Sequence, residues 1–350
     1  MAMRIALDAR GGSHAPQAII EGAVQAAAQW EGLQFILVGD ASRLSPLIRR
    51  YDFDPSRIQI LNAAEAVEDP EIPFEALKAK PNASITVALE AHHRGDADAV
   101  VSAGNSGAQV VASVEILGML EGVKRPAIGS YFPTRDGRTF LLDVGANVSC
   151  RPIHLLQFAA MGTIFRQHLD GLASPRVALL SNGEESSKGS HSIKEAHELM
   201  SLVPALNFIG NIEGRDLYSG KADVVVCDGF TGNVLLKFAE SIPDILAQYA
   251  DRSGITGAPA AALEQMRRSF DYQEFGGALL LGVNGVSVIC HGRSTAKAIS
   301  SAIAEAIKMV KFRINQHISD QIDTMGQWSA TVKTKALIGR WRRRSTGEKL

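Results

Sequence analysis

Short runs of β-branched and apolar residues alternate along this chain with helical patterns rich in Ala and Leu, and this alternation constrains the fold more than any other feature. Such a rhythm is typical of βαβ units, in which strands lie parallel and helices cover the sheet. Several runs are apolar throughout, as strands buried on both faces must be. We therefore predict a three-layer α/β/α fold around a mostly parallel sheet, with strands at Met3 to Leu7, Phe35 to Val38, Ile58 to Leu61, Ala99 to Val101, Ala127 to Phe132, Thr139 to Leu142, Val177 to Leu180, Asn207 to Ile209, Asp223 to Cys227 and Val286 to Cys290.

Two features modify this plan. Ala127 to Phe132 and Thr139 to Leu142 are joined across a polar turn and predict an antiparallel hairpin, so the sheet should be mixed. Residues 233–272 predict a protruding αα-hairpin, with one helix over Asn233 to Tyr249 and the other over Pro259 to Phe270. The Gly-rich stretch from Phe275 to Gly292 is interpreted as a turn and one buried strand. We expect a single α/β domain over residues 1–330, hairpin included.

Length and composition exclude several classes of protein. A chain of 350 residues that is 46% hydrophobic can bury its own core without disulfides. Its three cysteines, Cys150, Cys227 and Cys290, have no spacing typical of a zinc module or a disulfide framework. No metal site is therefore expected, and the reducing cytoplasm is the expected compartment. The charged N-terminus does not resemble a signal peptide.

Charge is unevenly distributed along the chain. Residues 331–350 form a basic C-terminal tail with seven Lys or Arg and one acid, in a chain whose net charge is −1. The rest of the chain is therefore acidic, and we expect it not to bind nucleic acid. The tail, with Trp341 among arginines, and the hairpin tip at Ile255 are both suited to an anionic membrane surface. The alternative is that the hairpin is a dimer contact and the tail a disordered end.

Six polar, glycine-rich clusters each follow directly on a predicted strand. Ligands of open α/β sheets bind outside the carboxyl ends of the strands, so we expect the clusters to converge there. The six are Asp8 to Pro16, Ser102 to Ala108, Asp143 to Pro152, Ser181 to Gly189, Asp228 to Lys237 and His291 to Ser294.

These clusters lack the motifs of nucleotide-binding loops. No two glycines are separated by a single residue, which excludes G-x-G-x-x-G, and the one Gly-Lys pair, Gly220-Lys221, lacks the rest of a Walker A loop. No organic cofactor is therefore expected. Residues 104–107 and 229–233 each open a predicted helix, where free N–H groups favour a small anion such as phosphate. The alternative is that each stretch is only a tight strand-to-helix turn.

Six segments, in order along nearly the whole chain, resemble the bacterial phosphate acyltransferase (PlsX) family: DARGGSHAP, SAGNSGA, LLDVGANVSCRP, SNGEESSKG, NFIGNIEGRDLYSGKADVVVCDGFTGNVLLK and GGALLLGVNGVSVICHGRS. The resemblance implies conversion of a fatty acyl–acyl carrier protein and inorganic phosphate into an acyl phosphate for phospholipid synthesis. It also implies a homodimer with a fold like those of isocitrate and isopropylmalate dehydrogenases and of phosphotransacetylase. Finally, it implies peripheral membrane contact near a membrane-bound glycerol-3-phosphate acyltransferase.

The implied reaction needs groups that hold phosphate, donors for the oxyanion and a proton for the departing thiolate. We assign Lys188 and the N–H groups from Asn105 to Gly107 to phosphate, Asn182 or Asn233 to the oxyanion, and His14 to the proton. Alternatively, Lys188 is solvated, both asparagines are caps, and His14 makes a structural hydrogen bond. The other residues expected to bind substrate are Asp8, Gly11, Gly12, Gly104, Ser106, Asp143, Asn147, Glu184, Asp228, Gly229, Phe230 and His291, although each Asp is also suited to fixing its own loop.

Two alternative functions remain open at this stage. Cys290 beside His291 suggests thiolase-like acyl transfer, but adjacent residues on a strand point to opposite faces, which favours a buried structural cysteine. The other alternative is a scaffold without catalytic activity that binds acyl carrier protein and the membrane. Stoichiometric consumption of phosphate distinguishes both from the acyltransferase.

Overall fold

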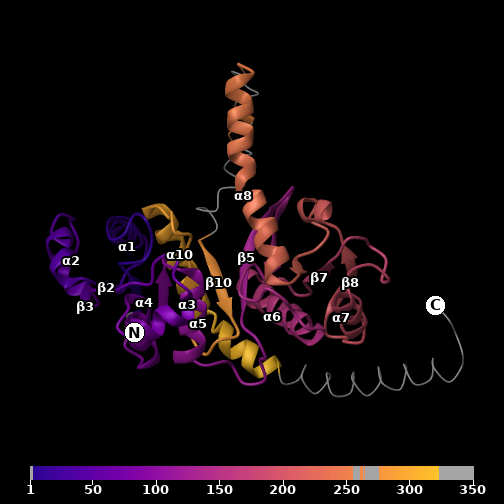
Figure 1. Ribbon diagram of the computed structural model, residues 1–350, viewed down its shortest axis with the longest axis horizontal. Helices are drawn as coiled ribbons and strands as arrows, with labels where there is room; N and C mark the ends of the chain where they lie inside the picture. Colours follow the sequence, from indigo (N-terminus) through magenta and orange to yellow (C-terminus); the bar gives the residue numbers. More distant parts are fainter. Residues whose placement is uncertain (1–2, 255–260, 263, 265–275, 323–350) are drawn as a thin grey trace, which may run out of the picture.

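The computed structural model describes residues 3–254, 261, 262, 264 and 276–322. Within them, one mixed sheet runs through the molecule in the order β3-β2-β1-β4-β11-β10-β5-β6-β9-β7-β8 (Figure 1). This confirms the predicted mostly parallel, mixed sheet. Its strands are β1 (Arg4–Asp8), β2 (Gln34–Gly39), β3 (Ile58–Asn62), β4 (Ala99–Ser102), β5 (Ala127–Thr134), β6 (Gly137–Leu142), β7 (Arg176–Leu180), β8 (Asn207–Ile212), β9 (Val224–Val226), β10 (Ala278–Leu281) and β11 (Ser287–Ile289).

One strand was not predicted. Residues 275–292 were expected to form a turn and a single strand, and that interpretation is wrong, because β10 and β11 form an antiparallel hairpin in which Leu279 pairs with Val288. A four-residue strand is too short to give a clear sequence period. The reversal after it depends on Gly282, whose φ of +91° lies in the left-handed region that favours glycine.

Strand polarity reverses within the sheet. The predicted hairpin of β5 and β6 is confirmed, with Thr134 paired to Gly137 across its turn. Strands β6, β9, β7 and β8 therefore run opposite to β1 to β4, β11 and β5. Because carboxyl ends of opposed strands lie at opposite edges, the expectation that all six polar clusters meet at one edge is wrong.

Helices cover both faces of the sheet. Along β1, Ile5 and Leu7 join the core under α1, α6, α7 and α10, whereas Ala6 joins the core under α3, α4, α5 and α8. This confirms the three-layer α/β/α arrangement. The helices are α1 (Gln17–Gln29), α2 (Ala41–Ile48), α3 (Pro73–Ala79), α4 (Ser84–His93), α5 (Ser106–Ile116), α6 (Pro152–Asp170), α7 (His191–Ser201), α8 (Gly229–Arg252) and α10 (Ala296–Lys311), with short 3₁₀ helices η1 (Pro55–Arg57) and η2 (Gly214–Ser219).

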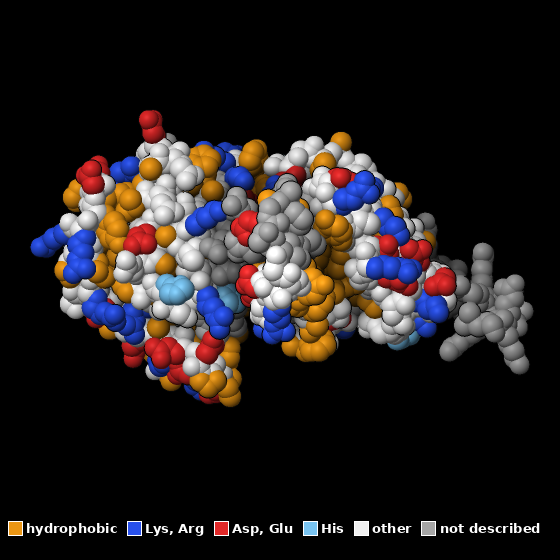
Figure 2. Space-filling view, turned by 90° about the horizontal axis from the view of Figure 1, so that it is seen from above, with side chains coloured by type: hydrophobic (Ala, Val, Ile, Leu, Met, Phe, Trp, Pro, Cys, Tyr) orange, Lys and Arg blue, Asp and Glu red, His pale blue; other side chains and the backbone are white. Residues whose placement is uncertain are grey.

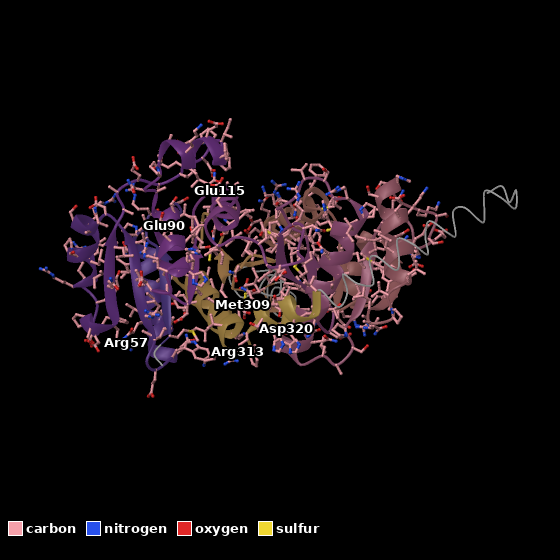
Figure 3. The ribbon with its side chains drawn as sticks, turned by 90° about the horizontal axis from the view of Figure 1, so that it is seen from below. Arg57, Glu90, Glu115, Met309, Arg313 and Asp320 are labelled. Atoms are coloured by element: carbon pink, nitrogen blue, oxygen red, sulfur yellow. The ribbon has the colours of Figure 1, made fainter. Side chains whose placement is uncertain are left out.

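The chain after β11 ties the two halves of the molecule together. Helix α10 packs against α1, and Figure 3 shows Met309, Arg313 and Asp320 along this last described segment as it crosses the middle of the molecule. Beyond α10, His317 stacks on His168 of α6, with ring centroids 3.6 Å apart. The C-terminal segment therefore contacts helices from both ends of the sheet.

Helix α8 projects far from the body of the molecule (Figure 1). It covers the first predicted arm of the αα-hairpin. Most of the second arm lies outside the described residues, as do the tip residue Ile255 and the tail with Trp341. Within the described part of the chain, no helix has the length and apolar character needed to span a membrane.

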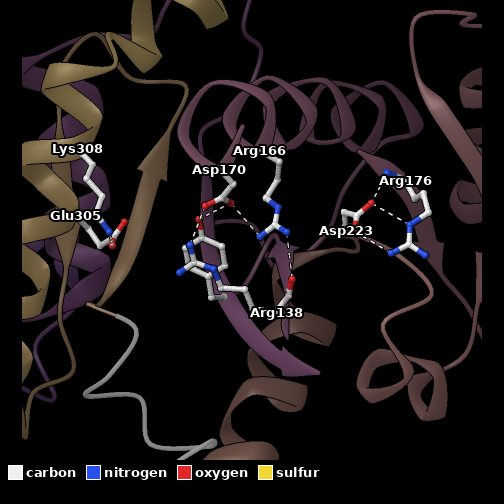
Figure 4. A network of polar contacts seen from close by, with 8 residues as sticks. Arg138, Arg166, Asp170, Arg176, Asp223, Glu305 and Lys308 are labelled. Atoms are coloured by element: carbon white, nitrogen blue, oxygen red, sulfur yellow. Dashed lines mark hydrogen bonds and ion pairs between the residues drawn. The ribbon is translucent and has the colours of Figure 1, made fainter. Parts of the chain in front are cut away.

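A buried charge network stabilises the junction of β5, β6 and α6 (Figure 4). Asp170 Oδ1 accepts from Arg138 Nη2 at 2.7 Å, and Asp170 Oδ2 accepts from the Tyr131 hydroxyl at 2.8 Å. Arg166 Nη1 lies 3.0 Å from Asp170 Oδ2, and the Arg166 side chain is only 6% exposed. Asp170 therefore compensates a guanidinium that water barely reaches.

Replacing Asp170 should be costly, because it leaves Arg166 charged and buried. We expect Asp170→Ala to lower the free energy of unfolding by about 3 kcal/mol in urea denaturation. The control is Asp136→Ala, since the Arg135–Asp136 pair is at least 75% exposed and should contribute less than about 1 kcal/mol. Equal losses in the two variants would contradict this account of the network.

Candidate functional site

Loops after β1 and β4 are joined by one buried carboxylate. Asp8 is 2% exposed, and its Oδ1 accepts from the backbone N–H groups of Arg10 and Gly11, both at 3.1 Å. Its Oδ2 accepts from the Ser102 hydroxyl at 2.7 Å, which in turn accepts from the N–H of Gly104 at 3.0 Å. Asp8 is thus a loop-fixing residue, which favours the alternative given for each Asp, and its contact with substrate stays a prediction.

The glycines of the first loop allow close packing. A Cβ on Gly11 would lie 2.6 Å from the backbone nitrogen of Gly104. Gly12 has a φ of +97° and lies against the carbonyl oxygens of Ala103 and Gly292. The loops after β1, β4 and β11 therefore interlock through backbone contacts.

Asn105 is the N-cap of α5, and both polar atoms of its side-chain amide have hydrogen-bond partners. Its Oδ1 accepts from the N–H of Ala108 at 2.9 Å, which caps the helix. Its Nδ2 donates to Asp69 Oδ1 at 2.6 Å. The first N–H groups of a helix have no intrahelical partner, so those of Ser106 and Gly107 are left available to a ligand.

A second buried carboxylate organises the loop after β6. Asp143 is fully buried and accepts five hydrogen bonds, four from backbone N–H groups and one from the side chain of Asn147. Burial raises the pKa of Asp143, while these donors oppose that shift by favouring the carboxylate. Asn147 also donates to the carbonyl of Pro126 at 2.7 Å. Both side chains are therefore engaged in holding this loop, and their contact with substrate stays a prediction.

The start of α8 is fixed in a similar way. Asp228 caps the helix by accepting from the N–H of Thr231 at 2.8 Å. A Cβ on Gly229 would lie 2.7 Å from the carbonyl oxygen of Asn147, so this glycine permits close packing. Phe230 is 63% exposed. These three residues do not line the cavity described next, contrary to expectation.

One cavity of about 550 Å³ lies between α5, α8 and the middle of the sheet. Five of the six polar clusters contribute to it, all except the one after β7. Its polar lining comes mainly from Ser13, Asp69, Gly104, Asn105, Ser106, Gly107, Ser130, Asn233, Lys237, Glu240, His291 and Arg293. Its apolar lining comes mainly from Ile128, Phe132, Val144, Leu236, Ala239 and Ile289.

Four predicted catalytic or binding residues lie elsewhere. Asn182, Glu184 and Lys188 are exposed on the loop after β7 and do not line the cavity. Glu184 pairs with Lys221 at 2.9 Å rather than positioning Lys188. His14 is exposed too, with its Nδ1 3.4 Å from the carbonyl oxygen of Ser294. Of the four predicted catalytic residues, only Asn233 lines the cavity.

Helix α8 presents an unexpected polar face to the cavity. Asn233, Lys237 and Glu240 follow one another at intervals of four and three residues, which places them on one side of a helix. Burial raises the pKa of Glu240, while His291 and Lys237 oppose that shift. The spacing was visible in the sequence, but only a fold that turns this face inward distinguishes it from a solvated one.

His291 enters the cavity from the loop after β11. Its Nδ1 accepts from the backbone N–H of Arg293 at 3.1 Å. The proton of the neutral ring is therefore on Nε2. With Arg293 beside it, this loop supplies a donor and a cation, of which only His291 was predicted.

Comparisons with known proteins show the family of this chain. A family model described as "Fatty acid synthesis protein" matches residues 3–317. The phosphate acyltransferase of Heliobacterium modesticaldum is 46% identical over 336 residues, which cover 92% of this chain and 99% of that protein. The chain belongs to the phosphate acyltransferase family. Another member, from Salinibacter ruber, is also 46% identical, over 87% of this chain and 93% of its own length.

Solved structures show that this phosphate acyltransferase family member shares its fold with phosphotransacetylases. The phosphotransacetylase of Streptococcus pyogenes superposes with a TM-score of 0.60 at 20% identity, over 89% of this chain and 94% of that one. A branched-chain phosphotransacylase of Enterococcus faecalis gives 0.57 at 16% identity, over 88% and 99%. The predicted likeness to phosphotransacetylase is therefore confirmed for the fold.

The raised pKa of Glu240 predicts a cost in stability. The folded chain holds the Glu240 proton more tightly than the unfolded chain, so its contribution to stability falls as the pH rises from the ordinary Glu pKa through the raised one. We expect Glu240→Gln to raise the Tm by roughly 1–3 °C at pH 7 and by less than about 1 °C near pH 4.

The control for this measurement is Glu198→Gln, an exposed acid on α7, which should change the Tm at neither pH. A lower Tm for Glu240→Gln at pH 7 would mean that the carboxylate is stabilised in the cavity, contrary to this prediction.

Proposed function

We propose that this chain transfers the acyl group of a fatty acyl–acyl carrier protein to inorganic phosphate. The products are an acyl phosphate for phospholipid synthesis and the carrier protein with a free thiol. The names of its relatives support acyl transfer to phosphate. The observation that carries the proposal is a single cavity that joins the anion-binding start of α5 to an apolar floor of β5 and α8.

Phosphate is itself the nucleophile in this reaction, so no side chain has to form a covalent intermediate. A phosphate oxygen attacks the thioester carbonyl carbon, the C–O bond forms and the C–S bond breaks. Hydrogen phosphate loses its proton when the acyl phosphate forms, and the departing thiolate gains one to become the free thiol. We assign the N–H groups of Ser106 and Gly107 to phosphate, Asn233 to the oxyanion and Glu240 to the proton, since its raised pKa favours the acid form.

Cations complete the proposed phosphate site. Lys237 and Arg293 line the cavity and suit a dianion. The roles first assigned to Lys188, Asn182 and His14 stay proposals, because none of these three residues lines the cavity in this structure. For Lys188 and Asn182 to act, the loop after β7 must approach the cavity when substrate binds, or a second copy of the chain must bring it. His14 follows Ser13, which already lines the cavity, so only its side chain has to turn.

Both alternative functions are less well supported. Burial raises the pKa of Cys290 to about 12, and the residue is 2% exposed, so a nucleophilic thiolate is disfavoured. A scaffold without catalytic activity has no need of a half-buried acid, a lysine and a histidine around one cavity.

Phosphate-dependent loss of acyl–acyl carrier protein thioester tests the proposal. We expect Lys237→Ala to lower kcat/KM for phosphate by about 100-fold, because it removes a charge-assisted contact. Lys194→Ala, exposed on α7, is the control and should match the unaltered chain. A similar loss in Lys188→Ala alone would move phosphate to the loop after β7, and thioester loss without phosphate would refute the proposal.

The exposed face of α8 supports a homodimer. Five apolar side chains on α8, each more than half exposed, form what we call the α8 stripe: Phe230, Val234, Phe238, Ile245 and Tyr249. Figure 2 shows hydrophobic side chains gathered beside the central column where α8 points towards the viewer. Their near-heptad spacing is typical of helices that pack together. We propose that a second copy covers the stripe.

Disrupting the α8 stripe should therefore separate the subunits. We expect light scattering to give twice the chain mass of 37.4 kDa for the unaltered protein and once that mass for Phe238→Asp. Phe74→Asp is the matched control, because Phe74 is 53% exposed but lies on α3. A monomeric unaltered chain would exclude the dimer.

Membrane contact completes the proposed function. An acyl phosphate has an apolar tail and must pass to a membrane-bound glycerol-3-phosphate acyltransferase. We propose that the chain is cytoplasmic and docks peripherally, through the tip of the predicted helical hairpin and the basic tail. The hairpin supplies apolar area, and each basic residue near an anionic surface contributes about 1 kcal/mol.

A further inference from the structure

Asp69 was not predicted to take part in the site, yet it lines the cavity beside the start of α5. Its Oδ1 accepts from Asn105 Nδ2 at 2.6 Å, and Asn105 is itself held by the N–H of Ala108. Pro73, the first residue of α3, also packs on this turn, since a Cβ on Gly107 would lie 2.8 Å from its Cγ. The Asp69 carboxylate is therefore held at the N-terminal end of α5.

This placement creates an electrostatic conflict. The start of α5 favours an anion through its N–H groups and dipole, but Asp69 is itself an anion at the same place. Among the described residues, no ion pair joins Asp69 to a cation. A fully ionised ligand would face a carboxylate that can only accept hydrogen bonds. A ligand that carries its own O–H would donate to it instead.

We propose that Asp69 accepts a hydrogen bond from the O–H of hydrogen phosphate and so makes the cavity select phosphate over sulfate. The proposal rests on the proposed function, in which phosphate is the acyl acceptor at this cavity. Inorganic phosphate keeps a proton at neutral pH, whereas sulfate keeps none. The two anions otherwise share size, shape and tetrahedral geometry, so the proton is the feature by which a site can distinguish them.

A site built to bond a substrate O–H rejects an analogue that lacks it, because a buried polar group is then left unpaired. Such discrimination reaches about 10⁴-fold where water is excluded. Asp69 is exposed at the cavity wall, so we expect a smaller factor of about 10-fold for each anion.

Asp69→Asn reverses the hydrogen-bonding character of this group. The amide oxygen of the variant can still accept from Asn105, which turns its NH₂ towards the cavity as a donor. We expect the KM for phosphate to rise about 10-fold and the inhibition constant of sulfate to fall about 10-fold. Arsenate, which also keeps a proton, should follow phosphate. The control is Glu68→Gln, an exposed neighbour that does not line the cavity and should alter neither constant.

The opposite signs of these two changes make the test specific. Loss of charge alone would improve the binding of both anions, and damage to the loop would weaken both, so parallel changes in Asp69→Asn would overturn the role of Asp69. Those outcomes leave phosphate-dependent turnover by the unaltered chain intact. Failure of the proposed function would instead appear as no phosphate-dependent turnover in the unaltered chain.

Discussion

Buried carboxylates at the ends of strands hold the cavity together. Asp8 joins the loops after β1 and β4, and Asp143 gathers five donors from the loop after β6 and from the start of β5. Loops without regular structure have backbone N–H groups that must find partners once water is excluded. A short acidic side chain supplies two acceptor oxygens at a fixed point, so several donors can meet there. Asp8 and Asp143 therefore maintain the shape of the cavity by binding the backbone of the loops around it.

The reversal of strand polarity decides what the cavity contains. Because β10 and β6 are antiparallel to β5, the loops after β4 and β11 and the loop after β6 leave the sheet at opposite edges. Helix α8 crosses the sheet face between them and brings Asn233, Lys237 and Glu240 to the same space. The result is an apolar floor with a polar rim, which suits a fatty acyl thioester at one end and a small anion at the other. Two acids in that rim, Asp69 and Glu240, are costly beside an anion unless Asp69 accepts a hydrogen bond from it and Glu240 carries a proton.

Sequence patterns located the site in part. The glycine-rich turn at residues 104–107 and the start of α8 were recognised because free N–H groups at a helix start follow from local geometry alone. Asp69 was missed because an isolated acid in a loop has no local signature. Lys237 and Arg293 lie inside two of the polar clusters, but the sequence does not show which members of a cluster face a cavity. Lys188 stood in an equally polar cluster, yet its loop follows β7, the one cluster that does not reach the cavity. No sequence period distinguishes a strand end that faces a cavity from one that faces solvent.

By itself, the sequence determined the layers of the fold, ten strand positions, the β5–β6 hairpin and the family, since these depend on short-range periodicity and on long runs of matching residues. Tertiary structure alone decided the position of β10, the edges at which the polar clusters lie, and which acids are buried. Those properties arise from pairing between segments far apart in the chain, such as β10 with β5, where Leu280 pairs with Ile128. A sequence does not show whether an acidic residue is buried or exposed. Only the packing around it distinguishes an acid that holds a loop, such as Asp143, from one that lines the cavity, such as Glu240.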